Sequence, residues 1–149
     1  MIQATKNLFI TACLLAGMTV SSVAFAQKAK VEKMDKRKYD IEIKETTTEG
    51  KKYEKDVFEF TPREIVSDYF EAKFKVSTLH YKTVKDSTVT EDGDTLKYFQ
   101  VSATEKTDKA DENFYLEAVI KGREIAGKVM LKKGEVVKKA WEFEGSQNN

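Results

Sequence analysis

The sequence predicts an all-β protein: an antiparallel up-and-down β-barrel of about eight strands that follows a cleaved signal peptide. Charged and apolar residues alternate through most of residues 38–145, which is typical of strands with one buried face. Short turns that contain glycine or aspartate separate these runs. Consecutive hairpins of this number favour a meander that closes on itself and leaves no open edge.

The first residues have the three parts of a secretory signal. Lys6 supplies the positive charge, residues 8–18 form the apolar stretch, and Ala24 and Ala26 occupy the small-residue positions before the cleavage point. We therefore expect residues 1–26 to be removed and the protein to be exported, either periplasmic or secreted. The apolar stretch is shorter than the roughly 20 residues that span a bilayer, so no transmembrane segment is expected after cleavage.

The single cysteine, Cys13, precedes the Leu-Ala-Gly triplet of residues 15–17, whereas a lipid-anchored protein carries cysteine directly after such a triplet. We expect Cys13 to be lost with the signal peptide. The mature chain then forms no disulfide and depends on its packed core for stability.

Charge suggests little about partners. The chain has 26 basic and 25 acidic residues, which argues against nucleic-acid binding because such proteins usually carry a strongly basic patch. Residues 27–37 are locally basic and predict a solvated leader, with contact to an anionic lipid or glycan as the alternative. The barrel is expected over residues 38–145, and residues 146–149 are expected to form a disordered tail.

Individual strands follow from the alternation. Tyr39, Ile41 and Ile43 share one face of the first strand, and the second covers residues 53–60. Later runs occupy residues 79–89, 96–103, 114–121, 125–131 and 137–143. The Glu-Asp-Gly-Asp sequence at residues 91–94 predicts a tight hairpin turn.

Residues 65–76 fit two structures. A strand would place Phe70, Ala72, Phe74 and Val76 on one face, whereas a helix beginning near Pro62 would bring Phe70 and Phe74 together at helical spacing. A strand that opens with a helical turn is the favoured interpretation.

The closing hairpins carry a recognisable motif. Residues 119–129 read Val-Ile-Lys-Gly-Arg-Glu-Ile-Ala-Gly-Lys-Val, and Lys-Gly at 133–134 and Trp-Glu-Phe-Glu-Gly at 141–145 follow. This order resembles the last hairpins of small exported bacterial lipocalin-like (calycin-type) proteins of unassigned function. The resemblance implies an eight-stranded barrel and no particular ligand. The chain departs from true lipocalins because it has no Gly-x-Trp near the first strand, and Trp141 lies on the last strand instead.

Enzymatic signatures are thin in the sequence, and a hydrolase would need two acidic residues, or His80 and an acid, to converge in a cleft. His80 is the only histidine, so the chain cannot form a histidine-rich zinc site, and any Ser-His-acid triad would have to use His80. The acidic turn at residues 91–94 lacks the spacing of a calcium-binding loop. We therefore predict a protein that is not an enzyme, with no catalytic residues, no metal and no cofactor.

An outer-membrane barrel would show the same alternation with its apolar face reversed. Short turns on both sides, lysine- and glutamate-rich polar faces and the polar residues 146–149 argue against it.

A binding function is expected inside the barrel, because an eight-stranded barrel is either filled by its own side chains or holds one small ligand. We predict a non-enzymatic protein that binds a small apolar or amphipathic molecule there, with tyrosines offering polar contacts. The alternative is a filled barrel that serves as an interaction or structural module of the cell envelope without a ligand. The candidate interior residues are Tyr39, Ile41, Phe58, Phe60, Phe74, Tyr81, Tyr98, Phe114, Leu116, Trp141 and Phe143.

Overall fold

A computed structural model describes Met34 and residues 36–149 of the protein. The expected signal peptide, its cleavage positions Ala24 and Ala26, and most of the expected basic leader lie outside the described residues. Within the described part, no helix is both long enough and apolar enough to cross a membrane.

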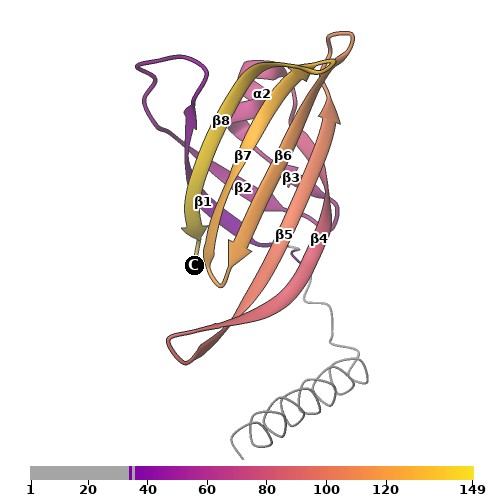
Figure 1. Ribbon diagram of the computed structural model, residues 1–149. Helices are drawn as coiled ribbons and strands as arrows, with labels where there is room; N and C mark the ends of the chain where they lie inside the picture. The colour runs from indigo at the N-terminus through magenta and orange to yellow at the C-terminus, as the bar shows by residue number, and fades with distance from the viewer. Residues whose placement is uncertain (1–33, 35) are drawn as a thin grey trace, which may run out of the picture. The chain divides into compact units, whose positions relative to one another are not determined.

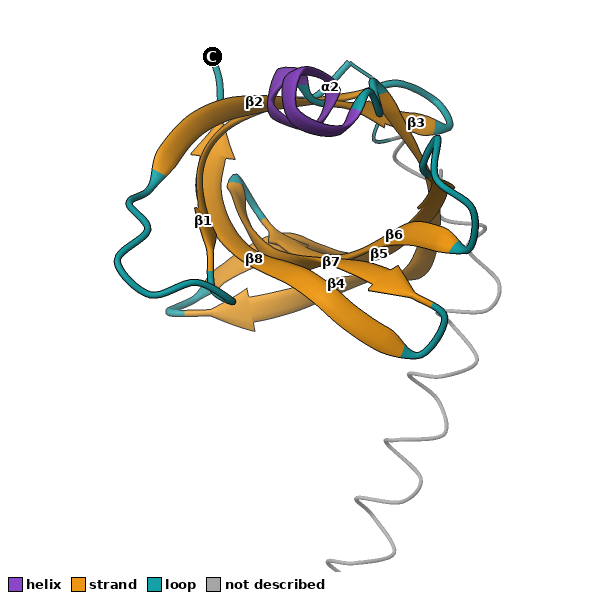
Figure 2. Ribbon diagram, turned by 90° about the horizontal axis from the view of Figure 1, so that it is seen from above, coloured by secondary structure: helices purple, strands orange, loops and turns teal. Residues whose placement is uncertain are grey.

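Eight antiparallel strands form a closed barrel in which each strand pairs with its neighbours in sequence (Figure 1). The predicted up-and-down barrel is confirmed, and its last strand pairs with its first. The elements are β1 (Lys38–Glu45), β2 (Glu54–Phe60), β3 (Glu64–Val66), α2 (Asp68–Phe74), β4 (Thr78–Glu91), β5 (Asp94–Lys106), β6 (Glu112–Lys121), β7 (Glu124–Lys133) and β8 (Val136–Gln147). Figure 2 shows the strands as a ring with α2 at its rim, next to β2 and β3.

Alternation along the strands fills the interior. In β1, Tyr39, Ile41 and Ile43 are buried, whereas Lys38, Asp40 and Glu42 between them are exposed. The same period of two runs through β6, where Phe114, Leu116, Ala118 and Ile120 are buried. Buried apolar side chains from all the strands and from α2 join in one core.

Residues 65–76 depart from the favoured prediction. Only Glu64–Val66 is a strand, and Asp68–Phe74 is a helix, so the strand expected over Phe70–Val76 was wrong. The helix also begins later than its alternative proposed, because Ser67 rather than the Thr-Pro pair caps it. The Ser67 hydroxyl accepts a hydrogen bond from the Phe70 N–H (3.3 Å), and Lys75 ends the helix in the left-handed conformation (φ 60°).

Strand β8 runs two residues beyond the expected end of the barrel. Ser146 and Gln147 pair with Asp40 and Tyr39 of β1, and the Gln147 N–H donates to the Arg123 carbonyl (2.7 Å). Backbone hydrogen bonding to β1 outweighs the polar character of these side chains. Ser146 and Gln147 of the expected tail are therefore part of β8, and the Asn148 N–H also donates to the Lys38 carbonyl (2.7 Å).

Two glycines allow neighbouring strands to approach closely inside the barrel. A Cβ atom at Gly127 would lie 2.7 Å from Cζ of Phe143, and one at Gly145 would lie 2.8 Å from Cα of Ile41. Both Cβ atoms would also collide with a backbone carbonyl of an adjacent strand. Side chains are excluded at these positions, which are sites where barrel strands commonly bend.

The β4–β5 hairpin extends past the rest of the barrel (Figure 1). We call residues 84–97 the β4–β5 arm. Its tip is the predicted two-residue turn at Asp92 and Gly93, which both have positive φ (51° and 87°), the requirement of a type I′ turn. A β-bulge between Thr83 and Lys85 marks the base of the arm.

Candidate functional site

Most of the predicted interior residues lie inside the barrel. Their side chains are at most 3% exposed, and they comprise Tyr39, Ile41, Phe58, Phe60, Phe114, Leu116, Trp141 and Phe143. They come from β1, β2, β6 and β8, whose buried faces all point to the same interior. Whether they bind a ligand stays a prediction.

Phe70 of α2 fills the barrel from one end. Its ring is fully buried and lies 5.3 Å from the ring of Phe114, 5.7 Å from that of Trp141 and 6.4 Å from that of Phe58, measured between ring centres. The contacts with Phe114 and Trp141 are edge-to-face, the arrangement that aromatic rings prefer. Aromatic side chains of the protein itself therefore occupy the space where a ligand was expected.

Hydrogen bonds fix α2 over this aromatic cluster. The indole N–H of Trp141 donates to the Tyr69 hydroxyl (3.1 Å). At the start of the helix, the Ser67 hydroxyl donates to Asp56 of β2 (2.6 Å). Burial raises the pKa of Asp56, although its hydrogen bonds with Ser67 and with backbone N–H groups oppose this shift.

Phe74 and Tyr81 are half-buried and pack against the core from its edge. The Phe74 ring lies 5.1 Å from the ring of Phe114 and 5.4 Å from that of Trp141. The Tyr81 hydroxyl was expected to offer a polar contact to a ligand. It donates instead to the Thr61 carbonyl in the β2–β3 turn (2.9 Å).

Tyr98 does not face the interior, which corrects the prediction. Its neighbour Phe99 is 1% exposed and points inward, so Tyr98 lies on the outer face of β5. There its ring accepts a cation–π contact from Lys85 of the arm at 5.3 Å.

The outer face of the barrel carries a large hollow, which we call the outer groove. It measures about 1450 Å³ and is lined by residues of α2, β1, β2 and β5–β8, Tyr98 among them. A second hollow of about 440 Å³ adjoins it and shares Val119, Ala126 and Glu144 with it.

Strand register sets the side chains of the outer groove in rows that cross the strands. In the row that runs through the middle of β1, Lys55 lies opposite Glu42, Glu42 opposite Glu144, Glu144 opposite Ala126, and Ala126 opposite Val119. Two glutamates therefore face each other directly, a pairing that destabilises a sheet. This row begins with charged residues and ends in an apolar patch.

The next row, on the side toward the C-terminal end of β8, also combines charged residues with apolar or aromatic ones. Val57 lies opposite Asp40 of β1, and Glu124 lies opposite Lys121, which in turn lies opposite Tyr98. Val57 and Val119 expose 41% and 37% of their surface, which is high for large apolar side chains in strands.

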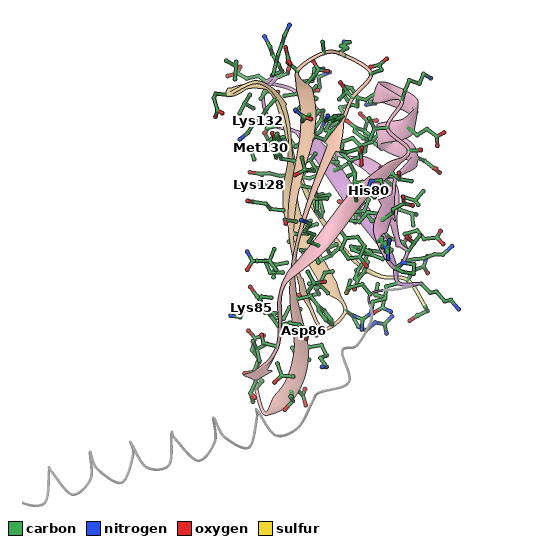
Figure 3. All side chains as sticks on the ribbon, turned by 90° about the vertical axis from the view of Figure 1, so that its right-hand side faces the viewer. His80, Lys85, Asp86, Lys128, Met130 and Lys132 are labelled. Carbon is green, nitrogen blue, oxygen red and sulfur yellow. The ribbon has the colours of Figure 1, made fainter. Side chains whose placement is uncertain are left out.

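A third row, on the other side of the first, is arranged differently. Lys44 lies opposite Glu142, Glu142 opposite Lys128, and Lys128 opposite Glu117, so that the signs of charge alternate. Lys128 Nζ and Glu117 Oε2 are 3.4 Å apart. In Figure 3, Lys128, Met130 and Lys132 leave β7 on the same side. This row therefore lacks the directly opposed glutamates of the first row.

The groove is strongly acidic as a whole. Seven of its lining residues carry carboxylates, and three carry ammonium groups. Two of these lysines are already engaged, because Lys73 lies 2.6 Å from Glu54 and Lys121 lies 2.9 Å from Glu91. The surface thus offers carboxylates beside exposed valines.

His80 lies at the centre of a second charged cluster. The two carboxylates of this cluster lie on opposite sides of the imidazole ring and do not face a common point. Figure 3 labels His80 on β4. Its Nδ1 lies 2.5 Å from Glu105 Oε2, and its Nε2 lies 3.0 Å from Glu64 Oε1. The hydrogen bond to Glu105 raises the pKa of His80, and the charges of Glu105 and Glu64 add to this shift. Because the two carboxylates lie at opposite ring nitrogens, and both nitrogens donate only in the protonated ring, the arrangement favours the protonated imidazole. The described residues contain no group of three or more acidic, histidine or cysteine residues able to hold a metal ion.

Sequence reasoning missed the outer groove. Its central pair, Glu42 and Glu144, comes together only when the first and last strands join. The signal available in the sequence was a valine at a position of the charged strand face, at Val57 and again at Val119.

No protein-family model, no curated protein and no solved structure matches this chain. The closed barrel of eight antiparallel strands is consistent with the lipocalin-like architecture that the closing hairpins indicated.

Proposed function

We propose that the chain is an exported, non-enzymatic binding module and that its outer groove recognises a cationic, amphipathic polypeptide segment. The observation that carries this proposal is the direct opposition of Glu42 and Glu144 at the centre of the groove. Like charges in this position cost stability, and a cationic partner relieves that cost when it binds.

The groove suits a polypeptide better than a small molecule. Small-molecule sites are usually about 300–1,000 Å³ and enclose most of their ligand. The outer groove, at about 1450 Å³, is larger and lies on the surface. Val57 and Val119 would contact apolar side chains of the segment, while Asp40, Glu42 and Glu144 would pair with its lysines or arginines. Its acidic character disfavours anionic lipid.

Packing inside the barrel supports the filled-barrel alternative over the interior pocket. Phe70, Phe114 and Trp141 contact one another in the space that a ligand would need. Uptake of a small apolar molecule into the interior remains a separate prediction, and the experiment below distinguishes it.

The test uses a fluorescent peptide of alternating lysine and leucine, titrated with the protein and followed by fluorescence anisotropy. We expect saturable binding that weakens about tenfold or more in the Glu42→Gln/Glu144→Gln double variant, since each 1.4 kcal/mol is a factor of ten in affinity. A peptide with glutamate in place of lysine should not bind.

Glu59→Gln is the control of equal charge change for the single variants Glu42→Gln and Glu144→Gln. Its carboxylate lies on the outer face of β2 and pairs with Lys38 (2.9 Å) outside the groove. If this variant weakens peptide binding equally, the effect comes from the net charge of the protein, and the assignment of the groove is refuted. Binding of palmitate that the groove variants leave unchanged, with no peptide binding, would support the interior pocket instead.

A further inference from the structure

The β4–β5 arm presents an open strand edge. β3 pairs with β4 only from Thr78 to His80, and among the described residues no strand pairs with that side of β4 farther along. Strand β4 nevertheless continues to Glu91, paired with β5 alone. Open edges of this kind accept an additional strand through backbone hydrogen bonds.

The turn determines which backbone groups face the open edge. In a two-residue type I′ hairpin, the flanking residues Glu91 and Asp94 bond to each other, and this phase repeats at every second residue. Asp86, Thr88 and Thr90 therefore direct their N–H and C=O groups away from β5. Figure 3 shows Lys85 and Asp86 near the base of the arm, which projects away from the barrel.

One antiparallel register joins this edge to the same edge of a second copy. With Thr88 on the two-fold axis, Thr88 faces Thr88, Asp86 faces Thr90, and Lys85 faces Glu91 of the second copy. Each half of the interface then contains one pair of opposite charges, and threonines meet at its centre. Both kinds of pair stabilise sheets.

Other two-fold registers that keep the same hydrogen-bonding phase are poorer, because none of them places Lys85 opposite Glu91. An axis at Ser87 would place Lys85 opposite Val89, and an axis at Val89 would place Asp86 opposite Asp92. An axis at Asp86 would place that carboxylate against its own copy, and an axis at Thr90 would place Asp86 beside Asp94 without any pair of opposite charges. The bulge at Thr83 and Lys85 limits the usable edge to Lys85–Glu91. Glu91 also contacts Lys121 of its own chain at 2.9 Å, so in the paired form it would lie between two lysines.

We propose that two copies of the protein associate through the β4–β5 arm, edge to edge about a two-fold axis at Thr88, to give a four-stranded ribbon between the two barrels.

A cysteine cross-link tests the register. In protein produced from the full chain with Cys13→Ser, Thr88→Cys should form a disulfide-linked dimer under mild oxidation, because hydrogen-bonded antiparallel partners have Cα atoms about 5.5 Å apart. Thr90→Cys is the control on the same strand face. In the proposed register the two Thr90 positions are offset by four residues, about 13 Å, which is too far to cross-link.

Charge exchange provides a second measurement without cysteine. Sedimentation equilibrium should show dimerisation of the wild type, weakened about tenfold or more by Lys85→Glu and restored by Lys85→Glu/Glu91→Lys. Lys138→Glu makes the same change of charge at an exposed position of β8, outside the arm, and should leave dimerisation unaffected. A monomeric wild type, or a dimer that Lys85→Glu does not weaken, or equal cross-linking by Thr88→Cys and Thr90→Cys would overturn the proposal.

Discussion

The Trp141 indole N–H donates a hydrogen bond to the Tyr69 hydroxyl at 3.1 Å, and this contact joins the last strand of the barrel to its one described helix. Tryptophan seldom remains buried without a partner for its N–H group. The bond therefore connects the position of α2 to the aromatic cluster below it.

Tyr69→Phe removes the acceptor and leaves the Trp141 N–H buried. We expect the free energy of unfolding to fall by about 1–3 kcal/mol, the cost of an unsatisfied buried donor. Urea unfolding followed by far-UV circular dichroism, which is independent of Trp141, measures this in all four proteins of the cycle. In a double-mutant cycle, Tyr69→Phe should cost much less in a Trp141→Phe background, and equal costs in both backgrounds would argue against the bond.

Phe70→Ala should open a cavity at the end of the barrel. Removing a buried phenylalanine costs about 3–5 kcal/mol, and apolar cavities of this kind can take up benzene. Isothermal calorimetry should detect benzene binding to the variant and none to the wild type. Binding of benzene to the wild type with similar affinity would mean that the interior is already hollow.

His80 should make stability depend on pH. Its folded-state pKa is raised above 6.5, so its stabilising contribution is complete below pH 6.5 and is lost as pH rises through the folded-state pKa. Urea midpoints measured across this range should fall for the wild type and stay flatter for His80→Gln. NMR titration of the imidazole supplies the pKa directly, and a value at or below 6.5 would contradict the Glu64–His80–Glu105 arrangement.

Gly145→Ala should destabilise the barrel where its first and last strands meet. The new Cβ would lie 2.8 Å from Cα of Ile41 and would collide with the Asp40 carbonyl, so the backbones must separate. Forced overpacking typically costs about 1–3 kcal/mol. Ser146→Ala, at the next position on the outer face, is the control for thermal unfolding. An unchanged melting temperature in Gly145→Ala would show that the strands are not this close.

Periodicity predicted the barrel because most strands have one buried and one charged face. It failed at residues 68–74, where Phe70 and Phe74 fit both a strand face and a helix face. The contact that favours the helix, between Ser67 and Asp56, comes from another strand and has no local pattern. Tyr98 was wrongly placed inside the barrel: it lies on the outer face of β5, where its ring contacts Lys85 of the arm, and Leu96 lies beside Gly122.

The candidate site was harder to predict than the fold. A row such as Lys55, Glu42, Glu144 and Ala126 draws on four strands, and its register depends on the closure of the barrel. Each of these residues by itself has the ordinary composition of a solvated strand face. Only their order across the sheet distinguishes the acidic row from the alternating row beside it.

Pairing between β1 and β8 has a consequence for how the chain folds. Tyr39 meets Gln147 and Glu45 meets Trp141, so these contacts close loops that contain almost the whole barrel sequence. The chain entropy of such a loop must be lost before the contact is gained, which makes this pairing an expected late and slow event. During synthesis, β1 can pair with β2 early but meets its second partner only after β8 has emerged, and a barrel without β8 would keep two unpaired edges. We therefore expect closure of the barrel to wait for β8.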